Sequence, residues 1–429
     1  MKKPASSIQH PASCVVIGCG RQGAAMVYDL IRYGSDRFNA VVLADRDPVQ
    51  IKRLVDRVKK ALRVTQTKLP KIVVKKVDAS QASALRPLIK GAGLVMSSSH
   101  YALNPIIAKA AVEEGVHYAD LGGELQSSIK IEKLGKAAAA KRIFLASDLG
   151  LAPGISSILV GWGVRHLQAG YSATVYCGGL PERPVGPLGY KIVFSVEGLW
   201  GTHLGKTAIL RDGRIVEIET LSEVENVNFG SLGSLEGFIT SGALATAPWT
   251  LCRQIRSYVY KTLRYPGYVE KLKFLRDMGL LSSEPVKING TSVLPRQLTG
   301  HLFNEKLSGF AVGDLVALRA VLKGKLKEEE LDPALRWDDE KSGAQEVVFE
   351  ALERSDSKLG FSAMERTTGF GAAAAAIQLL DQKASGFVLL ERDIDAEAYI
   401  KELQKRNIVI TRSQKSCLQP RPETVNLKP

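Results

Sequence analysis

The residues best suited to chemistry lie near the start of the chain, in a glycine-rich loop. Residues 18–23 read Gly-Cys-Gly-Arg-Gln-Gly, and they stand between an apolar run at 14–17 and a helical pattern at 24–32. In this setting the first glycine makes a tight turn, the second lets the backbone approach a pyrophosphate, and the third permits close packing of helix on strand. Because the start of the helix offers free N–H groups to phosphate oxygens, the loop predicts a dinucleotide site.

An acidic residue stands where such a site needs one. Asp45 ends the apolar run 40–44, at the roughly 20-residue spacing beyond the loop that is typical of a carboxylate bonded to the adenosine ribose. A carboxylate there repels a 2′-phosphate, so the sequence favours NAD over NADP. Arg46 follows directly and could cradle a phosphate. The alternative interpretation is a glycine-rich turn with an exposed Asp.

Two later strand ends are expected to line the same crevice, because ligands of such sheets lie beyond the carboxyl ends of the strands. The pair 78–79 could meet the adenine, and 97–99 could lie along the pyrophosphate and ribose. Helix capping and turn formation are the alternative roles for these residues. The expected cofactor-binding residues are Gly18, Gly20, Arg21, Gln22, Gly23, Asp45, Arg46, Asp78, Ala79, Ser97, Ser98, Ser99 and Leu121.

The elements that must position these residues are short apolar runs alternating with helical patterns. Strands that alternate with helices predict βαβ units, a parallel sheet and therefore an α/β, Rossmann-type domain over 1–153. The expected strands are 14–17, 40–44, 72–77, 94–96, 118–121 and 143–146.

After Gly154 the pattern changes, and a second, α+β domain with an open mixed or antiparallel sheet is expected over 154–365. The segment 346–353 is expected to pair with 312–322, and the charged stretch 323–341 between them is expected to be a surface excursion. The expected strands are 172–179, 190–196, 207–210, 215–219, 312–322 and 346–353.

The C-terminal part, 366–415, is expected to be a helical segment that returns to the first domain. An alanine-rich helix at 371–380 is too apolar to stand in solvent, so it should pack on the Rossmann domain. A last helix at 396–406 and a last strand at 408–410 follow. The Pro-rich residues 416–429 are expected to form a disordered tail.

Composition narrows the class of protein. With 429 residues, 45% hydrophobic and 24% charged, the chain has the balance of a soluble globular protein of two or three domains. The formal charge is +14, but the basic residues are scattered rather than gathered on one element, so an acidic ligand is favoured over nucleic acid. Five widely spaced cysteines without a Cys/His cluster indicate no metal site and a reducing compartment. Without an apolar run suited to a signal or a membrane span, a cytoplasmic enzyme is expected.

The order of several further motifs is similar to that of the saccharopine dehydrogenase-like oxidoreductases, and most closely to the lysine 6-dehydrogenases among them. The resemblance runs from about residue 13 to residue 412. Tyr268 and Glu124 depart from it, since each stands where a His is expected. The motifs are the loop with Asp45, Gly115–Gly123, Asp148–Gly154, Cys177–Pro181, Phe194–Leu199, Thr240–Gly242, Tyr260–Gly267 and Ala363–Gly369.

The resemblance implies oxidation of the ε-amine of L-lysine, with hydride passing to NAD and water releasing ammonia from the imine; the semialdehyde then cyclises. Asp120 and Asp148, each at a strand end near the expected nicotinamide, are the candidate catalytic bases, because partial desolvation would raise a carboxyl pKa toward neutrality. Their alternative role is helix or turn capping. His117 is expected to be a core residue. Substrate contacts are expected from Glu197, Lys261, Arg264, Tyr265, Thr240 and Ser241, with Arg264 gripping the α-carboxylate.

Other functions stay open at this stage. A saccharopine dehydrogenase-type enzyme, which joins or splits an amino acid and a keto acid, would need a second carboxylate anchor, and 183–191 could supply one. A redox sensor that binds NAD(H) without turnover is a third possibility, and the charges around Arg264 could instead hold two domains or subunits together. A small amino-acid substrate and a homodimer or larger homo-oligomer are the expected partners.

Overall fold

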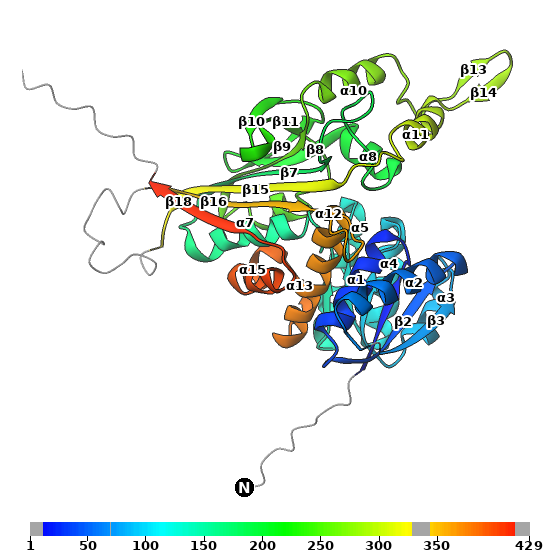
Figure 1. Cartoon of the computed structure of the whole chain (residues 1–429). Coiled ribbons are helices and arrows are strands. Elements are labelled where there is room, and N and C mark those ends of the chain that lie inside the picture. Colours follow the sequence, from blue (N-terminus) through cyan, green and yellow to red (C-terminus); the bar gives the residue numbers. More distant parts are fainter. Residues whose placement is uncertain (1–11, 69, 328–343, 417–429) are drawn as a thin grey trace, which may run out of the picture.

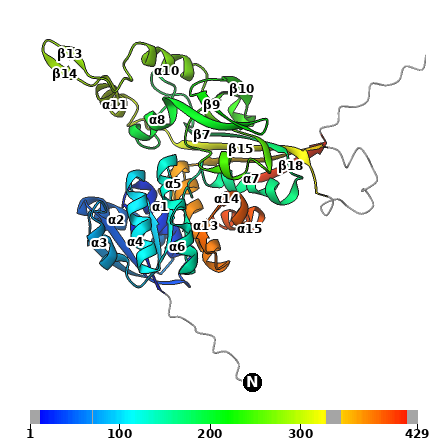
Figure 2. The same ribbon diagram turned by 180° about the vertical axis from the view of Figure 1, so that it is seen from behind.

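The computed structural model describes residues 12–68, 70–327 and 344–416. Two domains are stacked, each built on its own sheet, and the C-terminal segment lies against both (Figure 1). Seen from behind, helices α14 and α15 lie beside α7, below the sheet of the second domain (Figure 2). Within the described ranges no helix has the length and apolarity needed to cross a membrane.

The first domain is a parallel seven-stranded sheet in the order β3-β2-β1-β4-β5-β6, with β17 added beside β6. This order is that of a doubly wound dinucleotide-binding fold. All six strands expected from the sequence are present. The strands are β1 (Ala12–Ile17), β2 (Phe38–Asp45), β3 (Lys71–Lys76), β4 (Ala92–Ser97), β5 (His117–Asp120), β6 (Phe144–Ala146) and β17 (Gly386–Phe387).

Helices cover both faces of this sheet because its strands are apolar on both. In β1, Cys14 and Val16 face the helices α1 and α2, whereas Val15 and Ile17 face α3, α4, α5 and α6. The alternation of a β-strand puts neighbouring side chains on opposite faces, so a continuous apolar run predicts burial on both. The helices are α1 (Arg21–Tyr33), α2 (Pro48–Val64), α3 (Ala82–Ile89), α4 (Asn104–Glu114), α5 (Leu125–Glu132) and α6 (Gly135–Ala140).

The second domain is built on a mixed sheet in the order β10-β11-β12-β7-β15-β16-β18, with the hairpin β8–β9 joined to β12. β7 and β12 run parallel, and β15 and β16 pair antiparallel as expected from the sequence. The strands are β7 (Tyr171–Pro181), β8 (Lys206–Arg211), β9 (Arg214–Glu219), β10 (Glu225–Asn228), β11 (Ser234–Ile239), β12 (Ile255–Arg264), β15 (Asp314–Lys325), β16 (Ala344–Arg354) and β18 (Thr411–Ser416).

Two expected strands are wrong, one in this domain and one in the C-terminal segment. Residues 190–195 form no strand, and helix α8 (Val196–His203) follows them, because Tyr190, Val193 and Val196 are spaced three apart and enter one apolar cluster. The last strand is β18 rather than 408–410. Ser416, the first residue of the expected tail, belongs to β18, while 417–429 and most of the excursion 323–341 lie outside the described residues.

Helices pack on the sheet and complete the second domain. The helix α7 (Ile155–His166) packs against β7 and β15, and the Tyr171 hydroxyl in β7 donates to the carbonyl of Val160 at 3.3 Å. The hairpin of β13 and β14 extends from this domain at the upper right (Figure 1). The remaining elements here are α9 (Ala247–Thr250), α10 (Tyr268–Asp277), β13 (Val286–Ile288), β14 (Thr291–Val293) and α11 (Pro295–Lys306).

The C-terminal segment returns to the first domain, as the alanine-rich pattern predicts. Helix α13 (Gly371–Asp381) packs against α1 and β5, and its alanines are buried. Just before it, a Cβ added at Gly369 would stand 2.6 Å from the Cβ of Ala25 in α1, so the backbones approach too closely for a larger residue. The short elements α12 (Ala363–Glu365), η5 (Arg366–Phe370), α14 (Leu390–Asp393) and α15 (Ala396–Lys405) complete the segment.

Candidate active site

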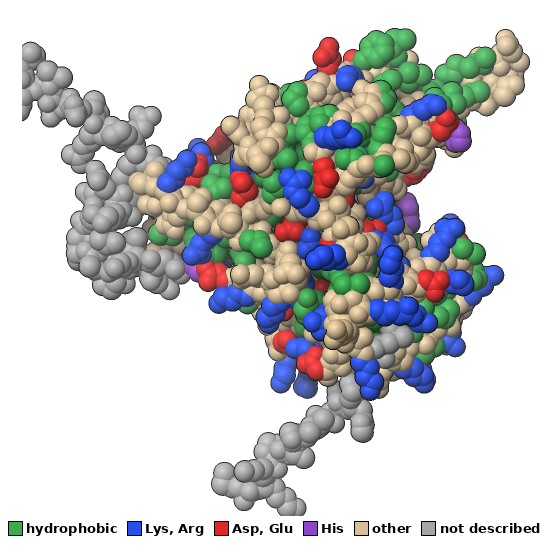
Figure 3. Space-filling view, in the orientation of Figure 1, with side chains coloured by type: hydrophobic (Ala, Val, Ile, Leu, Met, Phe, Trp, Pro, Cys, Tyr) green, Lys and Arg blue, Asp and Glu red, His purple; other side chains and the backbone are tan. Residues whose placement is uncertain are grey.

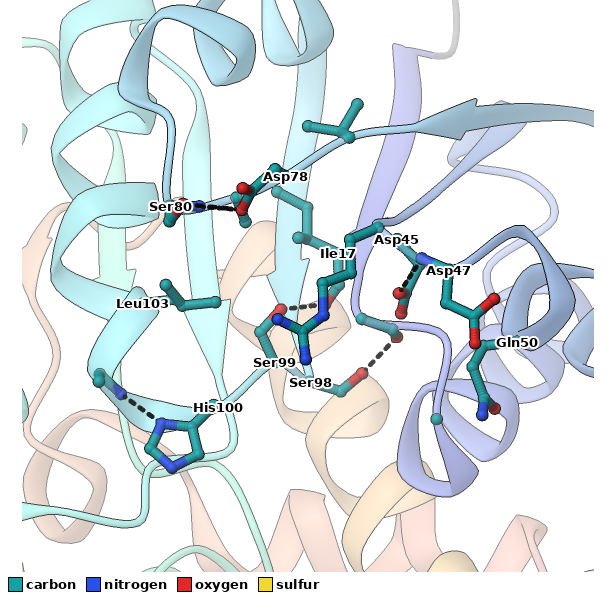
Figure 4. Close-up of a pocket in the computed structure, with 16 residues that line it drawn as sticks. Ile17, Asp45, Asp47, Gln50, Asp78, Ser80, Ser98, Ser99, His100 and Leu103 are labelled. Atoms are coloured by element: carbon teal, nitrogen blue, oxygen red, sulfur yellow. Dashed lines mark hydrogen bonds between the residues drawn. The ribbon is translucent and has the colours of Figure 1, made fainter.

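A crevice of about 680 Å³ opens beyond the carboxyl ends of β1, β2, β3 and β4. Figure 4 shows side chains from these strand ends and from the loops that follow them facing one space. Eight of the expected cofactor-binding residues line it: Gly18, Gly20, Asp45, Arg46, Asp78, Ala79, Ser98 and Ser99.

The glycine loop fits a dinucleotide, glycine by glycine. Gly18 has a φ of +96°, and a Cβ there would stand 2.7 Å from the carbonyl carbon of Ser98. A Cβ at Gly23 would stand 2.2 Å from the carbonyl oxygen of Gly18, so this glycine serves packing within the protein. At Gly20 a Cβ would meet no atom within 4 Å, and no side chain caps the start of α1. The open backbone and uncapped helix start suit a pyrophosphate.

Asp45 is held with its carboxylate at the crevice wall. Its Oδ2 accepts the N–H of Cys19 at 2.7 Å, and its Oδ1 accepts the N–H of Asp47 at 2.9 Å. Each carboxylate oxygen has more than one lone pair, so both oxygens can still accept hydrogen bonds from ribose hydroxyls. Ser98 and Ser99 donate to the carbonyls of Gly18 and Ile17, which ties the end of β4 to the loop (Figure 4).

Five expected cofactor residues do not line this crevice. Arg21 turns to Glu365, with Nε and Oε1 at 2.7 Å, and the Ser97 hydroxyl donates to Oδ1 of Asn104 at 2.8 Å inside the protein. Gly23 packs on the loop, and Gln22 lies beside it with a buried Oε1. Leu121 lines a different cavity, described next.

A second cavity, of about 210 Å³, lies where the two domains meet. Leu121, Gly123 and Gly150 form its Rossmann side, in the turns after β5 and β6. The opposite side comes from β7, β12, α8 and the segment that follows β11. The remaining lining residues are Leu151, Ala152, Pro153, Cys177, Gly179, Phe194, Thr202, His203, Thr240, Ser241, Ala243, Tyr260, Thr262, Arg264, Met364 and Thr368.

Arg264 brings a positive charge into this cavity. Its side chain is buried, one Nη donates to the carbonyl of Leu263 at 2.8 Å, and its Nε has no hydrogen-bond partner. The guanidinium lies over the rings of Tyr190 and Tyr268, at 4.6 and 5.4 Å from their centroids. Among the described residues no carboxylate forms an ion pair with it. A buried cation without an anion is costly, so the geometry suits an anionic ligand.

Lys261, Tyr265 and Glu197, three of the expected substrate residues, do not line the cavity of Arg264. Strand alternation sends Tyr260, Thr262 and Arg264 toward the cavity and Lys261 to the opposite face, where its Nζ pairs with Glu225 at 2.7 Å. Tyr265 lies in the apolar cluster of that other face and donates to the carbonyl of Pro181.

Glu197 is exposed in the mouth between the domains, a hollow of about 590 Å³ that adjoins the nucleotide crevice at His100. Figure 3 shows the surface hollowed between the two domains at the right of the view. By contrast, Thr240 and Ser241 do line the cavity of Arg264.

Asp120 and Asp148 lie next to the cavity but are not among the residues that line it, so a catalytic role for either stays a prediction. Oδ1 of Asp120 accepts the N–H of Gly122 at 2.6 Å and the hydroxyl of Ser147 at 3.0 Å, while Oδ2 of Asp148 accepts the hydroxyl of Ser128 at 2.6 Å. Both carboxyls are buried, and burial raises the pKa of each. In this geometry the pair holds the turn after β5 against the turn after β6.

Models of one protein family match both domains. Residues 14–144 match the model described as the saccharopine dehydrogenase NADP binding domain, and residues 150–409 match the model described as the saccharopine dehydrogenase C-terminal domain. The chain belongs to the saccharopine dehydrogenase family. With the geometry of the glycine loop and Asp45, this match makes the first domain a nicotinamide dinucleotide-binding domain.

Relatives within and near this family differ in length. The chain is 28% identical to a mouse mitochondrial alpha-aminoadipic semialdehyde synthase over 48% of this chain and 23% of that protein. It is 23% identical to the NADP(+), L-glutamate-forming saccharopine dehydrogenase of Pyricularia oryzae over 61% of this chain and 60% of that protein. The aligned regions thus span less than two thirds of either relative.

Two solved structures share the fold along nearly the whole chain. The apo L-Glu-forming saccharopine dehydrogenase of Saccharomyces cerevisiae has a TM-score of 0.71 at 18% identity, covering 94% of this chain and 100% of its own. The homospermidine synthase of Legionella pneumophila, solved with NAD, has a TM-score of 0.60 at 11% identity, covering 98% and 95%.

The sequence did not predict His203, which is buried and lines the cavity of Arg264. A signal was present, because His203 stands four residues after Leu199 in the expected Phe194–Leu199 motif and continues its pattern. The expected strand at 190–196 hid it. Once α8 is known to be a helix, Leu199 and His203 fall on one face.

Proposed function

We propose that the chain oxidises the ε-amine of L-lysine with NAD and releases ammonia. The observation that carries the proposal is the buried guanidinium of Arg264, which faces a cavity shared with the strand ends of the Rossmann domain and has no carboxylate partner among the described residues. The α-carboxylate of an amino acid would supply that partner in a two-pronged pair. A bound nicotinamide would accept the hydride.

The charges of the cavity favour a substrate with one carboxylate. Arg264 is the one Lys or Arg side chain among the lining residues. Arg183 and Lys191, suggested above as a second anchor, do not line it, and Lys191 donates to the carbonyl of Val312. Lysine needs one such anchor, whereas a conjugate of an amino acid and a keto acid needs more.

A second candidate function is a saccharopine dehydrogenase-type reaction. The hollow of about 590 Å³ at Glu197 favours it. This hollow is larger than the inner cavity and is lined by Arg296, whose guanidinium could pair with a second carboxylate. The names of the relatives point the same way.

We further propose that the cofactor is NAD rather than NADP. The support is Asp45, whose carboxylate is held at the crevice wall by two backbone N–H groups and would repel a 2′-phosphate. Arg46 lines the same crevice, and the matching family model is named for NADP, so the proposal needs a direct comparison of the two cofactors.

A substrate assay separates the candidates. The protein is given NAD and L-lysine, and NADH and ammonia are measured together. Equal amounts of both, without any keto acid, are the expected result. Joining an amino acid to a keto acid consumes reduced cofactor, so a parallel assay supplies NADH with L-lysine and 2-oxoglutarate. NADH oxidation that requires both compounds would replace the lysine proposal with the second candidate. No turnover under either condition would overturn both.

A further inference from the structure

His203 presents an unused hydrogen-bonding atom in the cavity of Arg264. The imidazole is only 1% exposed, and its Nε2 has no partner, although the residue lines the cavity. The ring is held by aromatic neighbours, with Phe238 at 5.7 Å and Tyr268 at 5.8 Å between ring centroids. A buried nitrogen without a hydrogen-bond partner costs folding free energy, so we expect a bound ligand to supply the missing hydrogen bond.

The hydroxyl of Thr202 determines whether Nε2 of His203 donates or accepts a hydrogen bond. Oγ1 of Thr202 donates its single proton to the carbonyls of Gly198 or Leu199, each at 3.1 Å. The same oxygen lies 2.8 Å from Nδ1 of His203. While a carbonyl engages the Thr202 proton, Oγ1 accepts from Nδ1–H, and a hydrogen bond of His203 with the Leu199 backbone favours the same tautomer. Nε2 is then the lone-pair nitrogen, an acceptor.

The ring also stays neutral. Burial, together with the positive charge of Arg264, lowers the pKa of His203 well below its usual value. A neutral acceptor repels a carboxylate and attracts a donor. The lining contains no Asp or Glu, so no carboxylate of the cavity wall competes for an ammonium group.

We propose that Nε2 of His203 accepts a hydrogen bond from the α-ammonium of the substrate while Arg264 holds the α-carboxylate. This inference rests on the site of the proposed function and makes His203 a specificity-determining residue. The cavity then recognises an α-amino acid zwitterion, and the amine to be oxidised is the one at the far end of the side chain. A ligand that keeps the carboxylate but lacks the α-amine should bind poorly.

The test compares L-lysine with 6-aminohexanoate, which lacks only the α-amine. For the unmodified protein we expect kcat/KM for L-lysine to exceed that for 6-aminohexanoate by roughly tenfold to a hundredfold, the range for a hydrogen bond to a charged group. His203→Phe, which keeps an aromatic ring, should bring the ratio close to one mainly by raising the KM of L-lysine. His203→Gln, which keeps an acceptor, should restore part of it. His301→Gln on exposed α11 is the matched control and should leave the ratio unchanged.

Two outcomes would overturn the proposal. One is an unmodified protein that does not distinguish the two compounds. The other is a His203→Phe protein that binds NADH normally and keeps the full ratio. If neither compound is oxidised, the proposed function fails by itself, and calorimetric binding of the same two compounds to the NADH complex decides the role of His203. His203→Leu replaces His203→Phe if the larger ring prevents NADH binding.

Discussion

Arg406 and Asp29 form a two-pronged ion pair that is completely buried, although they belong to opposite ends of the chain. Nε and Nη2 of Arg406 lie 2.7 and 2.9 Å from the two carboxylate oxygens of Asp29. The guanidinium also stacks over the ring of Tyr33, 4.3 Å from its centroid. The pair fixes the end of α15 to α1, so the C-terminal segment is bound to the helix that follows the cofactor loop.

The first prediction follows from this pair. Arg406→Ala would leave Asp29 buried without its partner, which lowers the free energy of unfolding by about 3–5 kcal/mol. Chemical denaturation, monitored by tryptophan fluorescence, measures it. Arg412→Ala removes an ion pair with Glu397 that is about half exposed and should change the stability by less than about 1 kcal/mol. Equal effects of the two variants would contradict the prediction.

The second prediction concerns cofactor choice. The unmodified protein should use NAD at least about tenfold better than NADP, equivalent to about 1.4 kcal/mol. Asp45→Ser should narrow that gap by removing the charge that repels a 2′-phosphate. Asp56→Ser, on the exposed side of α2, serves as the control. Steady-state kinetics with each cofactor measure the ratio, and equal use of both by the unmodified protein would rule out the role of Asp45.

The third prediction uses the two faces of β12. Arg264→Ala should raise the KM for L-lysine by a factor equivalent to about 2–5 kcal/mol, because a buried charge pair is lost. NADH binding should be nearly unchanged, since Arg264 does not line the nucleotide crevice. Lys261→Ala, three residues earlier but on the opposite face, should leave lysine kinetics intact. An anchor role is excluded if the two variants behave alike.

The fourth prediction is a pH dependence of stability. Burial raises the pKa of both Asp120 and Asp148 above the unfolded value, so the folded protein retains a proton that the unfolded chain has already released at neutral pH. Stability from this pair is complete below the unfolded pKa and is lost as pH rises through the folded one. The side chain of Asn does not ionise. As the pH rises from about 5 to about 8, the free energy of unfolding of Asp148→Asn should therefore increase relative to that of the unmodified protein. Chemical denaturation at several pH values in this range measures both. If the unfolding free energies of the two proteins change with pH in the same way over that range, the prediction is wrong.

The nucleotide half of the site could be predicted because its signals are local. The glycine spacing, Asp45 and the runs that became β1 to β6 are each set by neighbours in sequence. Lys261 and Arg264 were grouped together because they are close in sequence, although strand alternation separates them; which face meets the cavity depends on how β12 pairs with β7 and β11. The role of Asp120 depends on the turn after the neighbouring strand β6, and a local pattern does not contain that information.

The position of β17 has a consequence for how the protein is made. This strand completes the first sheet beside β6, yet the whole second domain lies between them in the chain. During synthesis the free edge of β6 therefore stays without a neighbour until Gly386 and Phe387 have emerged. An unpaired edge invites pairing with other chains, and short length is one way to limit that risk. β6 has only three residues, so the nascent chain offers little template for aggregation while it waits for its last strand.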